Sequence, residues 1–503
     1  MVFSLPEYRS KVLGCWMGKN IGGTVGAPFE WNRQVNDITF YTQDLGGNPM
    51  PNDDLDLQLL WLVALEERGL DIDARILGEY WLTFITPHWA EYGNGKLNMR
   101  AGLVPPLSGI ENNPFKDSCG AYIRSEIWAC IAPGNPALAA KYAYEDAIVD
   151  HGDGEGMYAE VFCAAVESAA FVVSDIAELI DIGLSYIPAG CGIAGAVRCA
   201  QDCFDRGLPW REARDEILTH YRGGCQWFSI SDEDRKKGFA EGRLGWDAPS
   251  NIGLTVLGLL YGSGDFERTM QITVNCGEDT DCTAATAGAL FGILHGIEAI
   301  PERWIAPIGR GIKTACLNLG ELGYMGSMLP QTVDELTQRT ERIARQMSLA
   351  GRLGATFTEQ GPTDTAAAAA SLRSKDNGAA LYRCLKGTIH RFDFFDVLVE
   401  YPDGAYARAN EPARVAVTIE NTYRIPAALR LHWYAPEGWV VSPGDGTLYS
   451  PHPWMSQGKL TREFTLQTEW FDSPEARFVL EITMPGRHTV MLAPVLLLNG
   501  AMK

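Results

Sequence analysis

The sequence predicts a multidomain protein in which an all-α domain is followed by an antiparallel β-sandwich. Its 503 residues exceed the roughly 300 that a single hydrophobic core usually supports, so more than one domain is expected. Apolar residues recur with a period near 3.6 through the first part of the chain, and the period changes to two in the last part. We therefore expect an all-α domain over residues 1–352, a linker or connector helix over 353–382 and an Ig-like β-sandwich over 383–503.

Charge and composition narrow the classes of partner. The chain carries 63 Asp and Glu against 42 Lys and Arg, which gives a net charge of -21, and its basic residues form no cluster. Because binding to a phosphate backbone depends on clustered Lys and Arg, we expect no nucleic-acid partner. No apolar run reaches the about 18 residues that span a bilayer, and the N-terminus lacks the pattern of a signal peptide. The sequence therefore predicts a cytoplasmic protein without a membrane partner.

The twelve cysteines are scattered and form no Cys-x-x-Cys pair. Reduced, buried thiols are therefore expected in preference to a disulfide framework. The pattern leaves the oligomeric state open, and a homo-oligomer is compatible with it.

The first element of the helical domain is a helix with a glycine at every fourth position. Gly14, Gly18, Gly22 and Gly26 fall along one side of such a helix, where the missing side chains permit close contact with a second helix. Glu30 follows at the end of this run.

The second element is a helix that opens with acids. Asn52 is the expected N-cap, Asp53 and Asp54 occupy the first turn, and a largely apolar segment follows until Gly69. A helix this apolar is expected to be buried.

A third segment, Asn275 to Gly288, has the same character. Asp279 is the expected N-cap, Asp281 lies in the first turn, and small residues follow. One such cluster alone would be interpreted as helix capping, in which acids near the N-terminus stabilise the helix by up to ~1 kcal/mol through their interaction with the helix dipole.

Two acidic helix starts that meet in one core would repel each other. A bound divalent cation is the simplest way to neutralise this repulsion. Carboxylate and amide oxygens are hard ligands, so the sequence favours Mg²⁺ or Mn²⁺ over a zinc site.

These three segments, in this order, resemble the ADP-ribosylglycohydrolase family over roughly residues 8–300. The shared features are a Gly-x-x-x-Gly-Ala-x-x-Glu type segment ending at Glu30, an Asp-Asp pair, and Gly-x-Asp-Thr-Asp before a helix of small residues. The resemblance implies an all-α fold and a centre of two Mg²⁺ or Mn²⁺ ions. It also implies that Glu30 acts near the scissile glycosidic bond as acid or base, with Asp54 as a second catalytic residue. The implied metal ligands are Asp53, Asp54, Asp279 and Asp281.

Two positions depart from the family pattern. Asn52 stands where many members have a metal-binding Thr, and Cys282 stands where a Thr follows the second Asp of the later motif. Both remain candidate ligands, because an amide offers its carbonyl oxygen and a thiol its sulfur. The sulfur is a soft ligand at a hard site, so metal occupancy, metal choice or substrate is expected to differ.

The segment from residue 87 to 114 is predicted to be irregular, because it contains Pro105-Pro106 and several glycines. A loop of this length in a compact domain is typical of a substrate loop, a lid or a disordered segment. His88 and Trp89 either line this loop or pack beneath it.

The next stretch, Asp117 to Arg124, is similar to the glycine-containing loop of the family that approaches the ligand before a helix. Backbone amides around Ser118, Gly120 and Ala121 suit a phosphate or a sugar hydroxyl. For Arg124 two interpretations remain, an anion contact and a structural salt bridge.

His151 follows in a segment rich in glycine and acids, at a position that resembles the histidine of the family before a helix. It is a candidate for substrate binding. The alternative is a capping or buried hydrogen-bonding group.

In the last part of the chain, alternating apolar runs at 415–419, 429–433 and 478–482 are separated by Pro-Gly type turns. This pattern predicts the β-sandwich, with a structural or dimerising role or with glycan binding as its function. The aromatic candidates for glycan binding are Trp433, Trp439 and Trp454.

The leading hypothesis for the whole chain is a metal-dependent glycoside hydrolase that cleaves an N- or O-glycosidic bond to ribose. Its substrate would be a small molecule or a protein-linked ribosyl or furanosyl group. Two alternatives stay open, a hydrolase of another furanoside or glycan and a catalytically inert homologue that binds or builds structure. Retention of Glu30 and the four aspartates weighs against the inert homologue.

Overall fold

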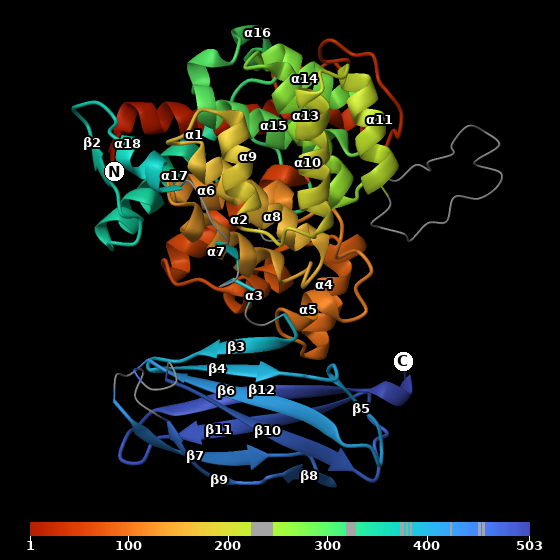
Figure 1. Cartoon of the computed structure of the whole chain (residues 1–503), viewed down its shortest axis with the longest axis vertical. Coiled ribbons are helices and arrows are strands. Elements are labelled where there is room, and N and C mark those ends of the chain that lie inside the picture. Colours follow the sequence, from red (N-terminus) through yellow and green to blue (C-terminus); the bar gives the residue numbers. More distant parts are fainter. Residues whose placement is uncertain are drawn as a thin grey trace, which may run out of the picture. The chain divides into compact units, whose positions relative to one another are not determined.

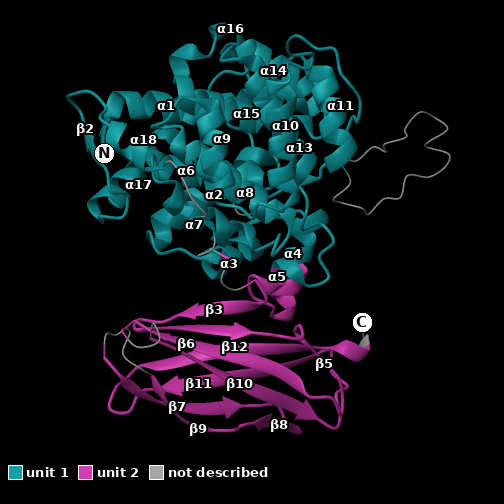
Figure 2. Ribbon diagram, viewed as in Figure 1, with its two compact units in different colours: residues 1–96, 109–381 teal, residues 97–108, 382–503 magenta. Residues whose placement is uncertain are grey.

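The structure is a computed structural model, and it describes residues 1–222, 245–317, 328–372, 377–378, 381–382, 385–422, 425–450, 454 and 458–502. The chain divides into two compact units (Figures 1 and 2). Unit 1 consists of Met1–Lys96 and Gly109–Leu381, and unit 2 of Leu97–Ser108 and Tyr382–Lys503. Among the described helices, none combines the length and the apolar composition that crossing a bilayer requires.

Unit 1 is helical, as predicted, and its core is built from apolar faces of successive helices. Its longer helices are α1 (Leu5–Gly26), α2 (Asp53–Arg68), α3 (Ala74–Phe84), α4 (Ala90–Ala101, which continues into unit 2), α7 (Pro136–Ala147), α8 (Glu155–Ala169), α9 (Ile176–Leu184), α10 (Gly192–Asp205), α11 (Trp210–Tyr221), α13 (Ala248–Gly262), α14 (Phe266–Asn275), α15 (Thr280–His295) and α17 (Val333–Leu349). The shorter ones are η1 (Ala27–Phe29), α5 (Leu107–Ile110, of which Leu107 and Ser108 belong to unit 2), η2 (Tyr122–Arg124), α6 (Glu126–Ile131), η3 (Ile297–Ala299), α16 (Glu302–Ile305) and α18 (Ala366–Leu372).

Helix α1 packs along α15 through the row of glycines that the sequence singled out. A Cβ atom at Gly14 would lie 2.7 Å from the carbonyl oxygen of Gly292, and one at Gly18 would overlap the backbone of Gly288. The same holds at Gly22, where it would overlap the backbone of Ala284. The predicted close helix contact is therefore confirmed, and it occurs between small residues on both helices.

The prediction of an irregular segment over residues 87–114 is wrong, since α4 and α5 lie within it. Glycines lower helix propensity, but here two of them are needed for packing. A Cβ at Gly93 would overlap the carbonyl of His88, and one at Gly95 would lie 3.1 Å from the Cβ of Asp150. Tertiary contact, not local propensity, determines the conformation of this segment.

After α17 the chain returns to the N-terminus. Strand β2 (Thr356–Thr358) pairs in parallel with β1 (Val2–Ser4), and α18 follows it. Part of the stretch predicted as a linker or connector helix therefore forms a small two-stranded sheet with the first residues of the chain.

Unit 2 is a β-sandwich of two five-stranded sheets, with strand orders β3-β4-β6-β10-β8 and β5-β12-β11-β7-β9. Neighbouring strands are antiparallel except for β12 and β5. The strands are β3 (Gly387–Arg391), β4 (Phe395–Glu400), β5 (Tyr406–Ala407), β6 (Ala413–Asn421), β7 (Ala427–Tyr434), β8 (Trp439–Ser442), β9 (Gly446–Ser450), β10 (Lys459–Thr468), β11 (Glu475–Thr483) and β12 (Val490–Asn499).

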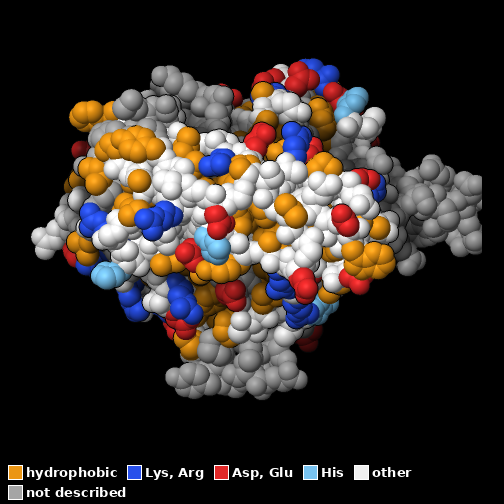
Figure 3. Space-filling model, turned by 90° about the horizontal axis from the view of Figure 1, so that it is seen from below, with side chains coloured by type: hydrophobic (Ala, Val, Ile, Leu, Met, Phe, Trp, Pro, Cys, Tyr) orange, Lys and Arg blue, Asp and Glu red, His pale blue; other side chains and the backbone are white. Residues whose placement is uncertain are grey.

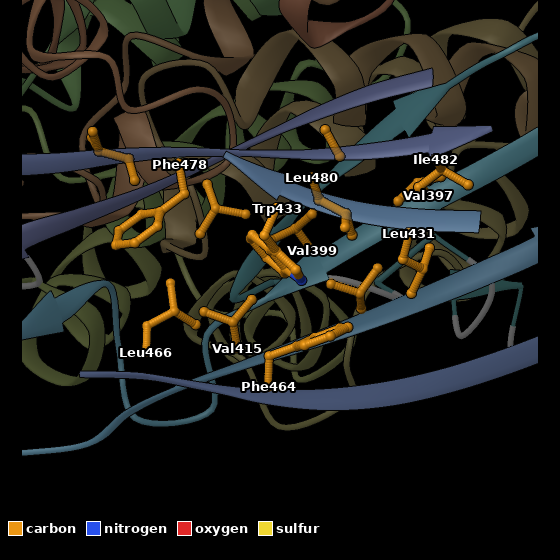
Figure 4. Close-up of a cluster of buried hydrophobic side chains, with 14 of the residues drawn as sticks. Val397, Val399, Val415, Leu431, Trp433, Phe464, Leu466, Phe478, Leu480 and Ile482 are labelled. Carbon is orange, nitrogen blue, oxygen red and sulfur yellow. The ribbon is translucent and has the colours of Figure 1, made fainter. Parts of the chain in front are cut away.

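The core of the sandwich is formed by the alternate residues that face inward from both sheets (Figure 4). Leu103 and Leu107, from the early segment of unit 2, join this core. Trp433 is only 8 % exposed and packs edge-on against Phe464, so its predicted role in glycan stacking is wrong. Trp439 instead lines a surface pocket of about 440 Å³ together with Trp470.

Charged side chains of both signs are mixed on the face of the molecule in Figure 3, where Lys and Arg lie among Asp and Glu. The ten cysteines that the structure describes are all free thiols, and most of them are buried.

Candidate active site and metal centre

The end of α1 fixes the start of α15 and the position of Glu30. The Thr280 hydroxyl donates a hydrogen bond to the carbonyl of Gly26 at 2.8 Å, where any side chain on Gly26 would meet the α15 backbone. Beyond Glu30, the amide of Trp31 donates to the carbonyl of Glu278 at 2.9 Å, and the amide of Glu278 donates to Asn32 at 3.1 Å. This short backbone bridge places Glu30 beside the first turn of α15.

The start of α2 also packs against α1. Asn52 caps α2, because its side-chain oxygen accepts a hydrogen bond of 2.7 Å from the amide of Asp54. A Cβ at Gly23 would overlap the side-chain amide of Asn52, so the glycine makes the space that Asn52 occupies. Both acidic helix starts are thus positioned by α1, one at Gly23 and the other at Gly26.

The acids of both helix starts meet at a pocket of about 370 Å³. Two groups of potential ligand atoms lie there, and within each group all atoms are within 4.8 Å of one another. One group is Asp54, Asp281 and Cys282, and the other is Glu30, Asp279 and Asp281. The residues that line the pocket are Ala27, Glu30, Trp31, Pro51, Asn52, Asp53, Trp89, Ala90, Glu91, Tyr92, Ser118, Cys119, Gly120, Ile123, Trp246, Asp279, Asp281, Cys282 and Ala315.

Burial and mutual repulsion raise the pKa values of these acids. Burial, followed by the charges of Asp53 and Asp54, raises the pKa of Glu30 to about 7. Burial and the charge of Glu30 raise the pKa of Asp281 to about 8. The pKa values of Asp54 and Asp279 are raised well above the ordinary value, again mainly by burial. Without a cation, these carboxyl groups therefore do not all ionise near neutral pH.

The aspartates have oxygens that no protein group satisfies. Oδ1 and Oδ2 of Asp54, Oδ1 of Asp279 and Oδ1 of Asp281 are buried without a hydrogen-bond partner among the described residues. Lys19 Nζ lies 3.7 Å from Asp54 Oδ1, close enough for ionic attraction but too far for a hydrogen bond. Asp279 precedes α15 as predicted, yet its side chain makes no capping bond and stays available. Unpartnered buried carboxylate oxygens in two overlapping groups fit divalent cations.

We expect the metal-free protein to lose stability as the pH rises from 3.8 to about 8, which are the ordinary and folded pKa values of Asp281. Glu30 contributes in the same direction between 4.5 and about 7. In this range the folded state binds more protons than the unfolded state, so the free energy of unfolding falls with rising pH. Thermal denaturation in chelator across this range tests the sign. Saturating Mn²⁺ should remove most of the slope, because the cation replaces the protons. A metal-free protein that becomes more stable over this range would contradict the assignment.

Several supporting residues were not predicted. Lys19 donates to Glu126 at 2.8 Å behind Asp54, and both side chains are buried. Asn251 accepts a 3.1 Å hydrogen bond from the amide of Asp279, and the hydroxyl of Tyr92 lies 3.3 Å from Asp53 Oδ2. The one signal for Lys19 was its charge, because no other charged residue occurs between Gly14 and Gly26. Tyr92 in α4 and Asn251 in α13 belong to helices in which the sequence showed no motif that would mark them as site residues.

The glycine-containing loop predicted from Asp117 to Arg124 lies only partly at the pocket. Ser118 and Gly120 line it, and any side chain on Gly120 would overlap the carboxylate of Glu91. Ala121, Arg124 and His151 are fully buried and are not lining residues.

Arg124 and His151 instead form an internal network behind Ser118. The Ser118 hydroxyl lies 3.1 Å from His151 Nε2, and His151 Nδ1 lies 3.0 Å from Asp150. Arg124 pairs with Asp150 at 2.6 Å and with Asp146 at 3.0 Å. Arg124 therefore takes part in a structural salt bridge, and its predicted contact with the substrate does not occur at this pocket. His151 therefore lies behind Ser118 and does not line the pocket.

Three tryptophans, Trp31, Trp89 and Trp246, are among the residues that line the pocket. Trp31 is 43 % exposed and Trp89 is 53 % exposed, and Trp31 meets Trp246 edge-on with ring centroids 5.9 Å apart. Of the two interpretations of Trp89, the structure supports the one in which it lines a pocket. Exposed flat rings at a pocket offer stacking surfaces for a base or a sugar.

Fold and pocket together define an all-α unit with an acidic pocket, built where two helices begin. The chain belongs to the ADP-ribosylglycohydrolase family, whose sequence model matches residues 4–346. A solved structure described as an "ADP-ribosylglycohydrolase-related protein complex" is similar at 20% identity and a TM-score of 0.40, over 68% of this chain and 100% of that one. No curated protein matches the chain.

Proposed function

We propose that this protein is a divalent-metal-dependent glycoside hydrolase that cleaves an N- or O-glycosidic bond to ribose in an ADP-ribosylated or related substrate. Membership of the family supports hydrolysis in general. The single observation that carries the metal dependence is the set of unpartnered, buried oxygens on Asp54, Asp279 and Asp281, which belong to the two overlapping groups of potential ligand atoms.

The ligands that we propose are the side-chain oxygens at the two helix starts. Asp281 belongs to both groups and would help to hold two ions, one together with Asp54 and the other together with Asp279. Asp53 and Asn52 line the pocket next to them. A bound pair of Mg²⁺ or Mn²⁺ ions would supply Lewis-acid polarisation and a fixed template for the sugar hydroxyls.

Glu30 is the residue that we propose for proton transfer. It faces the pocket, and in the metal-free protein burial is the main cause that raises its pKa to about 7, which suits a group that gains and loses a proton near neutral pH. Asp54 is buried and does not line the pocket, so its proposed catalytic contribution is to hold a cation rather than to touch the substrate. Ser118 and the backbone at Gly120 would position sugar hydroxyls, and Trp31 and Trp89 would stack on a ring.

We expect Glu30→Gln to reduce turnover by about 10²- to 10⁴-fold, the usual contribution of a general acid or base. Divalent-metal binding should change little, because the change removes a proton-transfer group while Asp279 and Asp281 stay in place. Steady-state kinetics and titration calorimetry with Mn²⁺ measure the two effects separately. Glu212→Gln, on the exposed face of α11, is the matched control. Parallel loss of metal binding would make Glu30 a ligand instead, and full turnover would exclude it from the reaction.

One observation favours a second candidate, hydrolysis of an uncharged furanoside or glycan. Among the described residues that line the pocket, five are acids and none is Lys or Arg. The acids are Glu30, Asp53, Glu91, Asp279 and Asp281. The negative charge of a diphosphate in this pocket would have to be neutralised by the cations and by backbone amides, whereas a neutral sugar has no such requirement.

A substrate panel distinguishes the candidates. Thermal shift and hydrolysis are measured with Mn²⁺ present, using ADP-ribose, an ADP-ribosylated peptide and neutral aryl furanosides. Stabilisation by ADP-ribose and release of ribosyl product support the first candidate. A response to furanosides alone supports the second. Stabilisation by metal with turnover of none of these substrates would indicate the inert homologue.

A further inference from the structure

The two groups of ligand atoms at the pocket differ in their chemistry. The group of Glu30, Asp279 and Asp281 offers carboxylate oxygens only. The group of Asp54, Asp281 and Cys282 combines two carboxylates with a sulfur. Asp281 is common to both, so the two positions are adjacent but not equivalent.

Cys282 is held in place by the helix that carries it. It lies in the first turn of α15 and is 8 % exposed. Its sulfur is within 4.8 Å of a carboxylate oxygen on both Asp54 and Asp281. Burial, followed by the charges of Asp279, Asp54 and Asp281, raises the pKa of the Cys282 thiol well above its ordinary value, so the sulfur would become a thiolate only when a bound cation displaces its proton.

The same group contains unsatisfied oxygens, and these point independently to a ligand. Both oxygens of Asp54 and one of Asp281 are buried and lack a hydrogen-bond partner among the described residues. A thiol is a weak donor and cannot satisfy two carboxylates. A cation bound by all three side chains would satisfy these oxygens.

We propose that the two metal positions are chemically unequal, with the position at Cys282 taking a borderline-soft divalent cation through a thiolate ligand, while the position at Asp279 keeps a hard cation. The proposal rests on the metal centre of the proposed function and adds a selectivity to it. Thiolate ligands favour ions such as Zn²⁺ and Co²⁺, and all-carboxylate sites suit Mg²⁺ and Mn²⁺. On binding, the metal–sulfur bond replaces the S–H bond, and the proton passes to water.

The chain provides a matched control for this sulfur. Cys119 lines the same pocket but belongs to neither group of ligand atoms. Replacing either cysteine by serine makes the same chemical change in the same pocket. A difference in metal binding between the two variants therefore reports where the sulfur lies relative to the metal, not the general effect of replacing a cysteine.

Cobalt is the test ion, because a thiolate bound to Co²⁺ gives an intense near-ultraviolet charge-transfer absorption that oxygen ligands do not give. The full-length protein is stripped with chelator and titrated with Co²⁺, and bound metal is measured in parallel. We expect the absorption in the wild type and in Cys119→Ser, and its loss in Cys282→Ser and Cys282→Thr. We also expect Zn²⁺ affinity to fall by at least about tenfold in both Cys282 variants, with Mn²⁺ affinity nearly unchanged.

The outcomes separate this proposal from the proposed function. Cobalt bound to the wild type without the absorption overturns the thiolate ligand and leaves a carboxylate metal centre standing. Absorption that survives in Cys282→Thr assigns the sulfur elsewhere and also overturns it. A wild type that binds neither Co²⁺ nor Mn²⁺ overturns both proposals. Unchanged Mn²⁺ binding in the Cys282 variants reports that they are folded.

Discussion

Asp281→Asn is expected to abolish stabilisation by divalent metal and to reduce turnover by about 10³-fold or more, because the loss of a proposed ligand of both metal positions removes several kcal/mol of transition-state stabilisation. Asp281 is the one side chain common to both groups of ligand atoms. Its loss therefore weakens both positions at once, whereas Asp54 and Asp279 each serve one. Thermal denaturation with and without Mn²⁺, together with kinetics on the identified substrate, measures both effects.

The same variant should behave in the opposite way without metal. In the folded wild type the pKa of Asp281 is raised to about 8, so ionisation of this group costs stability at alkaline pH. An uncharged amide does not carry this cost, and metal-free Asp281→Asn should be more stable than the metal-free wild type near pH 8. This distinguishes a lost ligand from a misfolded protein. The exposed Asp181→Asn, on α9, is the control, and metal stabilisation that persists in Asp281→Asn would contradict the centre.

Gly22→Ala is expected to destabilise the protein by about 1–3 kcal/mol or more, although alanine is the better helix former by ~1 kcal/mol. The added Cβ would overlap the backbone of Ala284, and backbone cannot move aside as a flexible side chain can. Helices α1 and α15 must then separate, which displaces Asp279 and Asp281 from the start of α2. Chemical denaturation measures the stability, and Mn²⁺ titration of the folded variant should show weaker binding.

Gly190→Ala is the matched control for this change. A Cβ at Gly190 meets nothing within 4 Å, so the substitution should be close to neutral. If Gly22→Ala were as stable as the wild type and bound Mn²⁺ equally well, the glycine contact would not position the site.

Much of the site could be predicted because its determinants are local in the sequence. The four-residue spacing of Gly14, Gly18, Gly22 and Gly26 is itself the contact surface with α15. Acids at a helix start are visible as such, and both clusters occur at the first turns where they were expected. The resemblance to the family then joined segments that lie far apart in the chain.

What could not be predicted depends on tertiary contact. Segment 87–114 has the composition of a loop, yet Gly93 and Gly95 are required for helix α4 to pack. A charged side chain such as Arg124 gives no indication from sequence whether it faces a ligand or a buried acid. Its pairing with Asp146 and Asp150 arises only when η2 meets the end of α7 and the turn that follows it.

The sandwich illustrates the same limit. Alternating apolar residues predicted its strands, and the inward faces form the core. Alternation also places Trp433 inward, so the sequence pattern itself argued against its role as an exposed stacking surface. The contribution of Leu103 and Leu107 to this core had no signal, because they lie almost 300 residues before the first strand of the sandwich, Gly387–Arg391.

The most direct test of the metal centre is anomalous diffraction from crystals of the full-length protein grown with Mn²⁺. The proposed centre requires anomalous density beside Asp281, within coordination distance of Asp54 on one side and of Asp279 on the other. If crystals saturated with Mn²⁺ had no density in this pocket, the carboxylates of the two helix starts would not be holding a cation, and the proposed chemistry would have no centre.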